Sequence, residues 1–208
     1  MAETILSAGD LALTGFNFDN PDELGFVLLT NITAGTKIKF TDNGWQSNGS
    51  FRSNEGIVEW TADRDYTAGE IILPSIDALG LSGSGDQILV YQGEDNNPTF
   101  LYALNSQGSG WQSDSTDSNT SALPTGLVEG ESAIALDEVD NAVYTGITSG
   151  TKEELLTSIS NTSNWNGSNS TRQSLATNSF DVASPELGAG DIAIIGFSFD
   201  NPDEFAFV

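Results

Sequence analysis

The hexapeptide FDNPDE, which occurs at residues 18–23 and again at residues 199–204, concentrates groups that could bind a cation. Its three carboxylates and one asparagine amide lie within five residues, and Ca²⁺ prefers such oxygen ligands. Asp10 and Asp191 precede the first strand of each copy and could bridge an ion at the junction between the copies. We therefore predict calcium as the cofactor. Its predicted ligands are Asp10, Asp19, Asp22, Glu23, Asp191, Asp200, Asp203 and Glu204.

The same hexapeptide also fits an ordinary hairpin turn. Pro21 presets φ, the side chain of Asp19 or Asn20 caps the turn, and the acidic groups remain in water. Its spacing does not match an EF-hand loop or a glycine-rich calcium nonapeptide. Both interpretations stay open at this point, and they are compatible because a turn can also bind a cation weakly.

Two of the four tryptophans, Trp111 and Trp165, lie in polar segments and are candidate carbohydrate-binding residues. Core packing and loop anchoring explain them as well. The chain has no histidine and no cysteine, which excludes Ser-His-Asp and Cys-His catalysis, disulfides and the usual zinc sites. We assign no catalytic residues and predict that the protein is not an enzyme, although residue types alone would allow a glycosidase with paired carboxylates.

The first residues of the sequence are repeated near its end. Residues 6–27 match residues 187–208 at 15 of 22 positions, with a constant offset of 187 − 6 = 181. Repetition at such a period is typical of an array of modules. We predict a module at residues 1–182, a linker at residues 183–186, and the first strands of a second repeat at residues 187–208.

The duplicated strands predict an assembly interface. Apolar strands with unpaired backbone groups pair with exposed sheet edges. In another copy of the protein, the site that residues 187–208 fit best is the one occupied by residues 6–27. This predicts head-to-tail donation of strands and, where the rotation does not close, a filament. The alternative is a disordered or collapsed tail. The predicted interface residues are Leu11, Leu13, Phe16, Phe18, Ile192, Ile194, Phe197, Phe199, Phe205 and Phe207.

The predicted secondary structure that carries these groups is mostly β-strand. Apolar runs bounded by Gly, Asn, Asp and Pro lie at residues 10–18, 24–30, 36–41, 57–61, 70–73, 87–91, 99–104, 132–136 and 142–144, with a short strand at 180–182. This spacing predicts an all-β, immunoglobulin-like antiparallel sandwich. Residues 151–159 predict one short helix with a capping box at Thr151 and Glu154. The polar segments 106–121 and 161–178 are predicted as loops.

The charge balance limits the partners. Thirty acidic and six basic residues give a net charge of −24, so nucleic acid and anionic membrane surfaces would repel the protein. The sequence has no apolar stretch long enough to cross a membrane, and residues 1–6 do not resemble a signal peptide. Clustered carboxylates favour the binding of a cation such as calcium, whose concentration outside cells is millimolar. We predict an extracellular or cell-surface location, with copies of the protein itself and surface glycans as partners.

Two motifs carry a family resemblance. FTDNGW at residues 40–45 and LSGSGDQILVY at residues 81–91 resemble the bacterial lamin-tail-like β-sandwich. The first unit is similar to modules of large secreted proteins of cyanobacteria and other bacteria, which often carry calcium-binding repeats or phosphoesterase domains. The segment 151–178 departs from a minimal domain of that family. The resemblance favours a structural or adhesive repeat module; the alternatives are an accessory domain of a secreted calcium-dependent enzyme and a carbohydrate-binding module.

Overall fold

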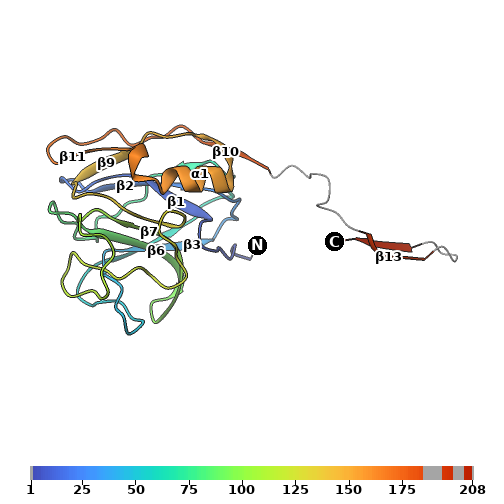
Figure 1. Cartoon of the computed structure of the whole chain (residues 1–208), viewed down its shortest axis with the longest axis horizontal. Coiled ribbons are helices and arrows are strands. Elements are labelled where there is room, and N and C mark those ends of the chain that lie inside the picture. The colour runs from blue at the N-terminus through green and yellow to red at the C-terminus, as the bar shows by residue number, and fades with distance from the viewer. Residues whose placement is uncertain (1, 185–193, 199–203, 208) are drawn as a thin grey trace.

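The protein is a sandwich of two five-stranded sheets with one short helix, as the sequence predicts (Figure 1). The computed structural model describes residues 2–184, 194–198 and 204–207. In order across the first sheet, the strands are β11 (Trp165–Ser168), β9 (Asn141–Tyr144), β1 (Leu11–Asn17), β2 (Glu23–Leu28) and β5 (Ile71–Ile72). Those of the second sheet are β4 (Ile57–Thr61), β3 (Lys37–Thr41), β6 (Gln87–Glu94), β7 (Asn97–Asn105) and β8 (Ala133–Ala135).

Two smaller sheets accompany the sandwich. β10 (Ser149–Thr151) pairs in parallel with β12 (Asp181–Ala183), so that Ala183, the first residue of the expected linker, belongs to a strand. β13 (Ile194–Ser198) pairs with β14 (Glu204–Phe207). β10 and β11 are not predicted from sequence, and β11 corrects the assignment of residues 161–178 to a loop. Both strands contain Ser and Gly, which have little strand preference, and they form because they pair with β12 and β9.

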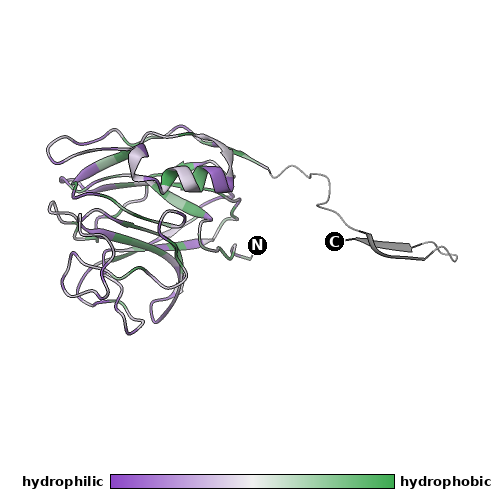
Figure 2. Ribbon diagram, viewed as in Figure 1, coloured by the Kyte–Doolittle hydropathy of each residue, from purple (hydrophilic) through white to green (hydrophobic). Residues whose placement is uncertain are grey.

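The hydrophobic core occupies both faces of the second sheet. In β6, Ile88 and Val90 face the first sheet, whereas Leu89 and Tyr91 belong to a separate cluster with Trp45, because successive residues of a strand point to opposite faces. The predicted loop at residues 106–121 contains no strand, and Trp111 packs against this second cluster. Figure 2 shows hydrophobic residues concentrated in the strands of both sheets.

Helix α1 (Lys152–Ile159) forms as predicted and packs beside the first sheet (Figure 1). Thr151 is its N-cap, and the reciprocal bonds of a capping box with Glu154 are present. Leu155 and Ile159 are fully buried one turn apart, which fixes the helix on the sandwich. Within the described residues, no helix is both long enough and apolar enough to span a bilayer.

Candidate functional site

The predicted calcium turn lies between β1 and β2, and its acidic groups contact protein donors. The Asp19 Oδ2 accepts a hydrogen bond from Asn141 Nδ2 at 2.7 Å. Glu23 forms an ion pair with Arg172 at 2.7 Å. Burial raises the pKa of Asp22, and the positive charge of Arg172 opposes this increase. Asp19 and Glu23 therefore contact different partners within the protein, Asn141 and Arg172.

Asp10 also has partners within the protein. Its carboxylate accepts a hydrogen bond from the Ser7 N–H at 2.6 Å and forms an ion pair with Lys152 at 2.5 Å. No group of three or more acidic, histidine or cysteine side chains in residues 2–184 is placed to hold a metal ion. Asp191, Asp200 and Asp203 lie outside the described residues, and of Glu204 only the backbone is described. Calcium binding stays a prediction.

The predicted interface residues of the first hairpin belong to the core of their own domain. Leu11, Leu13 and Phe16 are fully buried, and Phe18 is nearly so. In the second copy, Ile192 and Phe199 lie outside the described residues. The others, Ile194, Phe197, Phe205 and Phe207, lie in β13 and β14.

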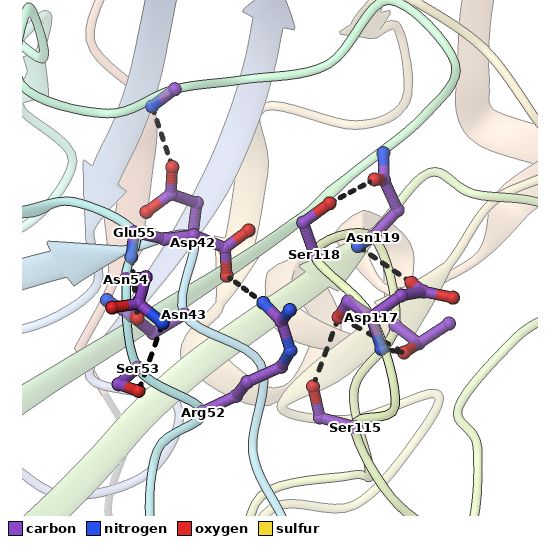
Figure 3. Close-up of polar contacts among 12 residues, drawn as sticks. Asp42, Asn43, Arg52, Ser53, Asn54, Glu55, Ser115, Asp117, Ser118 and Asn119 are labelled. Carbon is purple, nitrogen blue, oxygen red and sulfur yellow. Dashed lines mark hydrogen bonds and ion pairs between the residues drawn. The ribbon is translucent and has the colours of Figure 1, made fainter.

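A buried polar cluster at the end of β3 holds three loops together (Figure 3). Asp42 is only 1% exposed, and its two carboxylate oxygens accept hydrogen bonds from the N–H groups of Gly56 and Gly80, each at 2.7 Å. The neighbouring Asn43 accepts a hydrogen bond from the Glu55 N–H at 3.2 Å. These contacts cross 14 and 38 residues of chain, so the FTDNGW motif fixes the loops around the second sheet.

Two other buried side chains extend this cluster. Gln87 donates through Nε2 to the backbone oxygens of Asp42 and Ser118. Asp86 accepts hydrogen bonds from the N–H groups of Ser82 at 2.9 Å and Gln87 at 2.8 Å. Burial raises the pKa of Asp86 to about 8, although both hydrogen bonds oppose the increase. Since the oxygens of Asp86 are bonded to the backbone, this carboxyl group supports the loops rather than facing a ligand.

The pKa of a second carboxyl group in this cluster, Glu55, is also strongly raised. Figure 3 shows Arg52 reaching toward it, and the two side chains lie 3.6 Å apart. Burial raises the pKa of Glu55 to about 7, with a further increase from the charge of Asp42 and a decrease from Arg52. None of the main cavities of the described structure is lined by Glu55 or Asp42.

These raised pKa values predict that the fold is more stable at pH 5 than at pH 8. Above their unfolded pKa values of 4.5 and 3.8, Glu55 and Asp86 hold more protons in the folded chain than in the unfolded chain. Stability therefore falls as the pH rises from about 4 to about 8. We expect Glu55→Gln to raise Tm at pH 8 by about 2–4 °C, corresponding to about 1 kcal/mol, and to flatten the pH dependence. Thermal melts of both proteins at pH 5 and 8 measure this, and equal slopes would refute it.

A groove of about 430 Å³ lies beside the edge strand β11. Its wall includes Trp165, whose Nε1 donates to the Ile159 carbonyl oxygen at 2.7 Å. The apolar part is formed by Leu136, Val139 and Ala142, and the polar part by Asp137, Glu138, Thr162, Ser163, Ser168 and Asn169. The remaining lining residue is Gly167, where a Cβ would lie 2.7 Å from Val139. Thus the groove combines a fixed aromatic ring with hydrogen-bonding groups.

The acidic and amide groups of this groove are held in place. Asn169 donates through Nδ2 to Glu138 at 2.7 Å and accepts a hydrogen bond from the Asp140 N–H at 3.3 Å. Burial raises the pKa of Asp140, and the charges of Glu138 and Asp19 raise it further. The neighbourhood of the groove is therefore negative. Sequence analysis does not single out Glu138 or Asn169 as site residues, because they are 31 residues apart and only the fold brings them together.

The two predicted carbohydrate-binding tryptophans differ in their surroundings. Trp165 lines the groove and packs with its ring centroid 6.3 Å from Phe16 and 6.2 Å from Tyr144. Trp111 packs against the second hydrophobic cluster, and its Nε1 is buried with no hydrogen-bond partner among the described residues. The structure therefore places only Trp165 in a described cavity.

The protein is therefore an acidic β-sandwich with a duplicated hairpin. Comparisons of the chain with protein family models, with curated proteins and with solved structures found no match.

Proposed function

We propose that this protein is a non-catalytic structural or adhesive module of an extracellular repeat protein, in which such modules follow one another head to tail. The observation that carries the proposal is the register of β13 and β14. In the first hairpin, Leu13 pairs with Phe26 and the register shifts between Leu13 and Gly15. In the second, Ile194 pairs with Phe207 and the shift recurs between Ile194 and Gly196. The duplicated sequence therefore forms the same hairpin, with the same irregularity at the same place.

The position of the first hairpin indicates what its copy requires. β1 and β2 lie inside their sheet, with β9 on one side and β5 on the other. In the described part of the chain, β13 and β14 pair only with each other. A hairpin whose sequence suits the middle of a sheet has unpaired backbone N–H and C=O groups along both of its outer edges. Further strands of a second module would fill both edges, and this supports a tandem array.

Exchange of hairpins between copies is the second form of assembly, and two substitutions oppose it. Leu24 is 1% exposed and corresponds to Phe205, and inserting the larger side chain in a filled site costs about 1–3 kcal/mol. Asn17, which is fully buried and bonds to the segment around Gln173, corresponds to Ser198. A donated hairpin must also displace a resident hairpin whose core side chains are almost completely buried. We therefore favour the covalent array over strand exchange.

The surface charge is consistent with an extended assembly outside the cell. All six basic side chains of the chain form ion pairs with carboxylates, which leaves a large excess of negative charge unpaired. Repulsion between successive modules would keep an array extended and soluble. Extracellular cations such as calcium would reduce this repulsion.

A designed tandem protein tests the proposal. Residues 1–208 are followed by a second copy of residues 28–184, so that residues 187–208 take the place of the first hairpin of the second unit. We expect about twice the unfolding enthalpy of a single module, since this enthalpy scales with folded length, and a hairpin that resists proteolysis. The matched control carries residues 6–27 in place of residues 187–208. If the control folds as two units and the test protein as one, the hairpin does not begin a module.

Size-exclusion chromatography of residues 1–208 separates the two forms of assembly. The covalent array predicts a monomer at micromolar concentration, with or without residues 187–208. Oligomers that disappear when these residues are deleted would show strand exchange instead.

A further inference from the structure

The groove beside β11 has the chemistry of a ligand site, and we propose that it binds an uncharged saccharide. A sugar ring presents a C–H face that packs on an aromatic ring, and a rim of hydroxyl groups that need donors and acceptors. Trp165 supplies the aromatic ring, while Glu138 and Asn169 supply the polar partners. The volume of about 430 Å³ lies within the range of small-ligand pockets, about 300–1,000 Å³.

The groove is built in advance of the ligand. Trp165 cannot rotate freely, because its Nε1 is bonded to Ile159 and its ring packs against Phe16. The hydrogen bond of 2.7 Å between Asn169 and Glu138 fixes a carboxylate and an amide side by side. Such a pair can accept from one sugar hydroxyl and donate to the next. Binding would therefore order few protein groups, which favours affinity.

Charge selects the class of ligand. No basic residue lines the groove in the described structure, and Asp137, Glu138 and the nearby Asp140 make it negative. Uronic acids, sulfated glycans and phosphates would be repelled. A neutral sugar meets no such barrier, and carboxylates are strong acceptors for its hydroxyl groups. This inference goes beyond the proposed repeat architecture, because a module with or without tandem partners would carry the groove.

Titration of the full chain with neutral tetrasaccharides (maltotetraose, cellotetraose and chitotetraose) tests the site. The indole N–H signals in NMR separate Trp165 from the other three tryptophans, and total tryptophan fluorescence follows binding. We expect millimolar or tighter binding of one of these probes, unchanged between 50 and 500 mM NaCl. Glu138→Gln and Asn169→Ala should each weaken it roughly tenfold, the effect of losing one good hydrogen bond.

The controls keep the test decisive. Glu138 and Asn169 are exposed, so both variants should fold, which melting curves verify, whereas Trp165→Ala removes a packed residue and serves only as a supporting variant. Glu129→Gln removes an exposed carboxylate outside the groove and should leave binding unchanged. No binding to any probe at 10 mM overturns the proposal, and so does an affinity in Glu138→Gln and Asn169→Ala that equals that of the unaltered protein. A preference for polygalacturonate or for an oligolysine peptide, with affinity that falls as salt rises, overturns it as well.

Discussion

Asn17→Ser is expected to lower the free energy of unfolding by about 2–4 kcal/mol, because it removes three hydrogen bonds at a buried site. Asn17 donates through Nδ2 to Glu23 at 2.8 Å and to the Gln173 carbonyl oxygen at 3.0 Å. Its Oδ1 accepts a hydrogen bond from the Gln173 N–H at 2.7 Å. Serine is the residue of the second hairpin at this position, Ser198, and it is too short to reach both partners. Urea denaturation of the two proteins measures the difference.

A second substitution taken from the same hairpin provides the control. Leu13 is fully buried and corresponds to Ile194. Leu13→Ile conserves volume and should cost less than about 1.5 kcal/mol. If Asn17→Ser lowers the free energy of unfolding no more than Leu13→Ile does, the hydrogen bonds between Asn17 and Gln173 do not distinguish the two copies of the hairpin. The Asn-to-Ser difference would then add no large free-energy cost to strand exchange, and this argument for a covalent array would fail.

Gly69→Ala is expected to destabilise the fold by about 3–4 kcal/mol, through backbone strain and a steric clash. Gly69 has a φ of +95°, which L-residues with a side chain rarely adopt. A Cβ at this position would collide with the carbonyl oxygen of Phe180, whose N–H donates to the Gly69 carbonyl oxygen at 2.8 Å. The clash would separate the turn from the segment that leads into β12.

Gly35 is the matched control for this effect. It occupies the same position in a nearly identical turn, with a φ of +88°, and no atom lies within 4 Å of a Cβ built there. Gly35→Ala should therefore show the conformational strain alone, about 1 kcal/mol. Guanidinium denaturation of both variants separates the two contributions. Equal losses would mean that the contact between Gly69 and Phe180 is easily relaxed.

The predicted strands form where apolar runs coincide with turn signals. Thr33–Thr36 and Thr67–Glu70 each supply a glycine with positive φ before a new strand. The capping box of α1 is likewise local information, since Thr151 and Glu154 are three residues apart. The residues in β10 and β11 lack such signals. Their extended conformation depends on β12 and β9, which lie elsewhere in the sequence.

The candidate sites depend even more on distant contacts. The composition of FDNPDE correctly identifies a turn crowded with acidic groups, but Asn141 and Arg172 occupy two of these groups. No local pattern identifies those partners. The groove shows the same limit: Trp165 is recognisable as an aromatic residue in a polar segment, while Glu138 becomes its neighbour only through the pairing of β9 with β11.

The sandwich class, the helix and the duplication can be predicted from the amino-acid sequence, because hydrophobic periodicity and capping act over short distances and a repeat is recognised by direct identity. The sequence does not predict which carboxylates accept hydrogen bonds from backbone N–H groups, as Asp42 does, or which line a groove, as Glu138 does. The physical reason is that burial, charge and hydrogen bonding at a site are set by neighbours in space, and in this fold most of those neighbours come from strands and loops far apart in the chain.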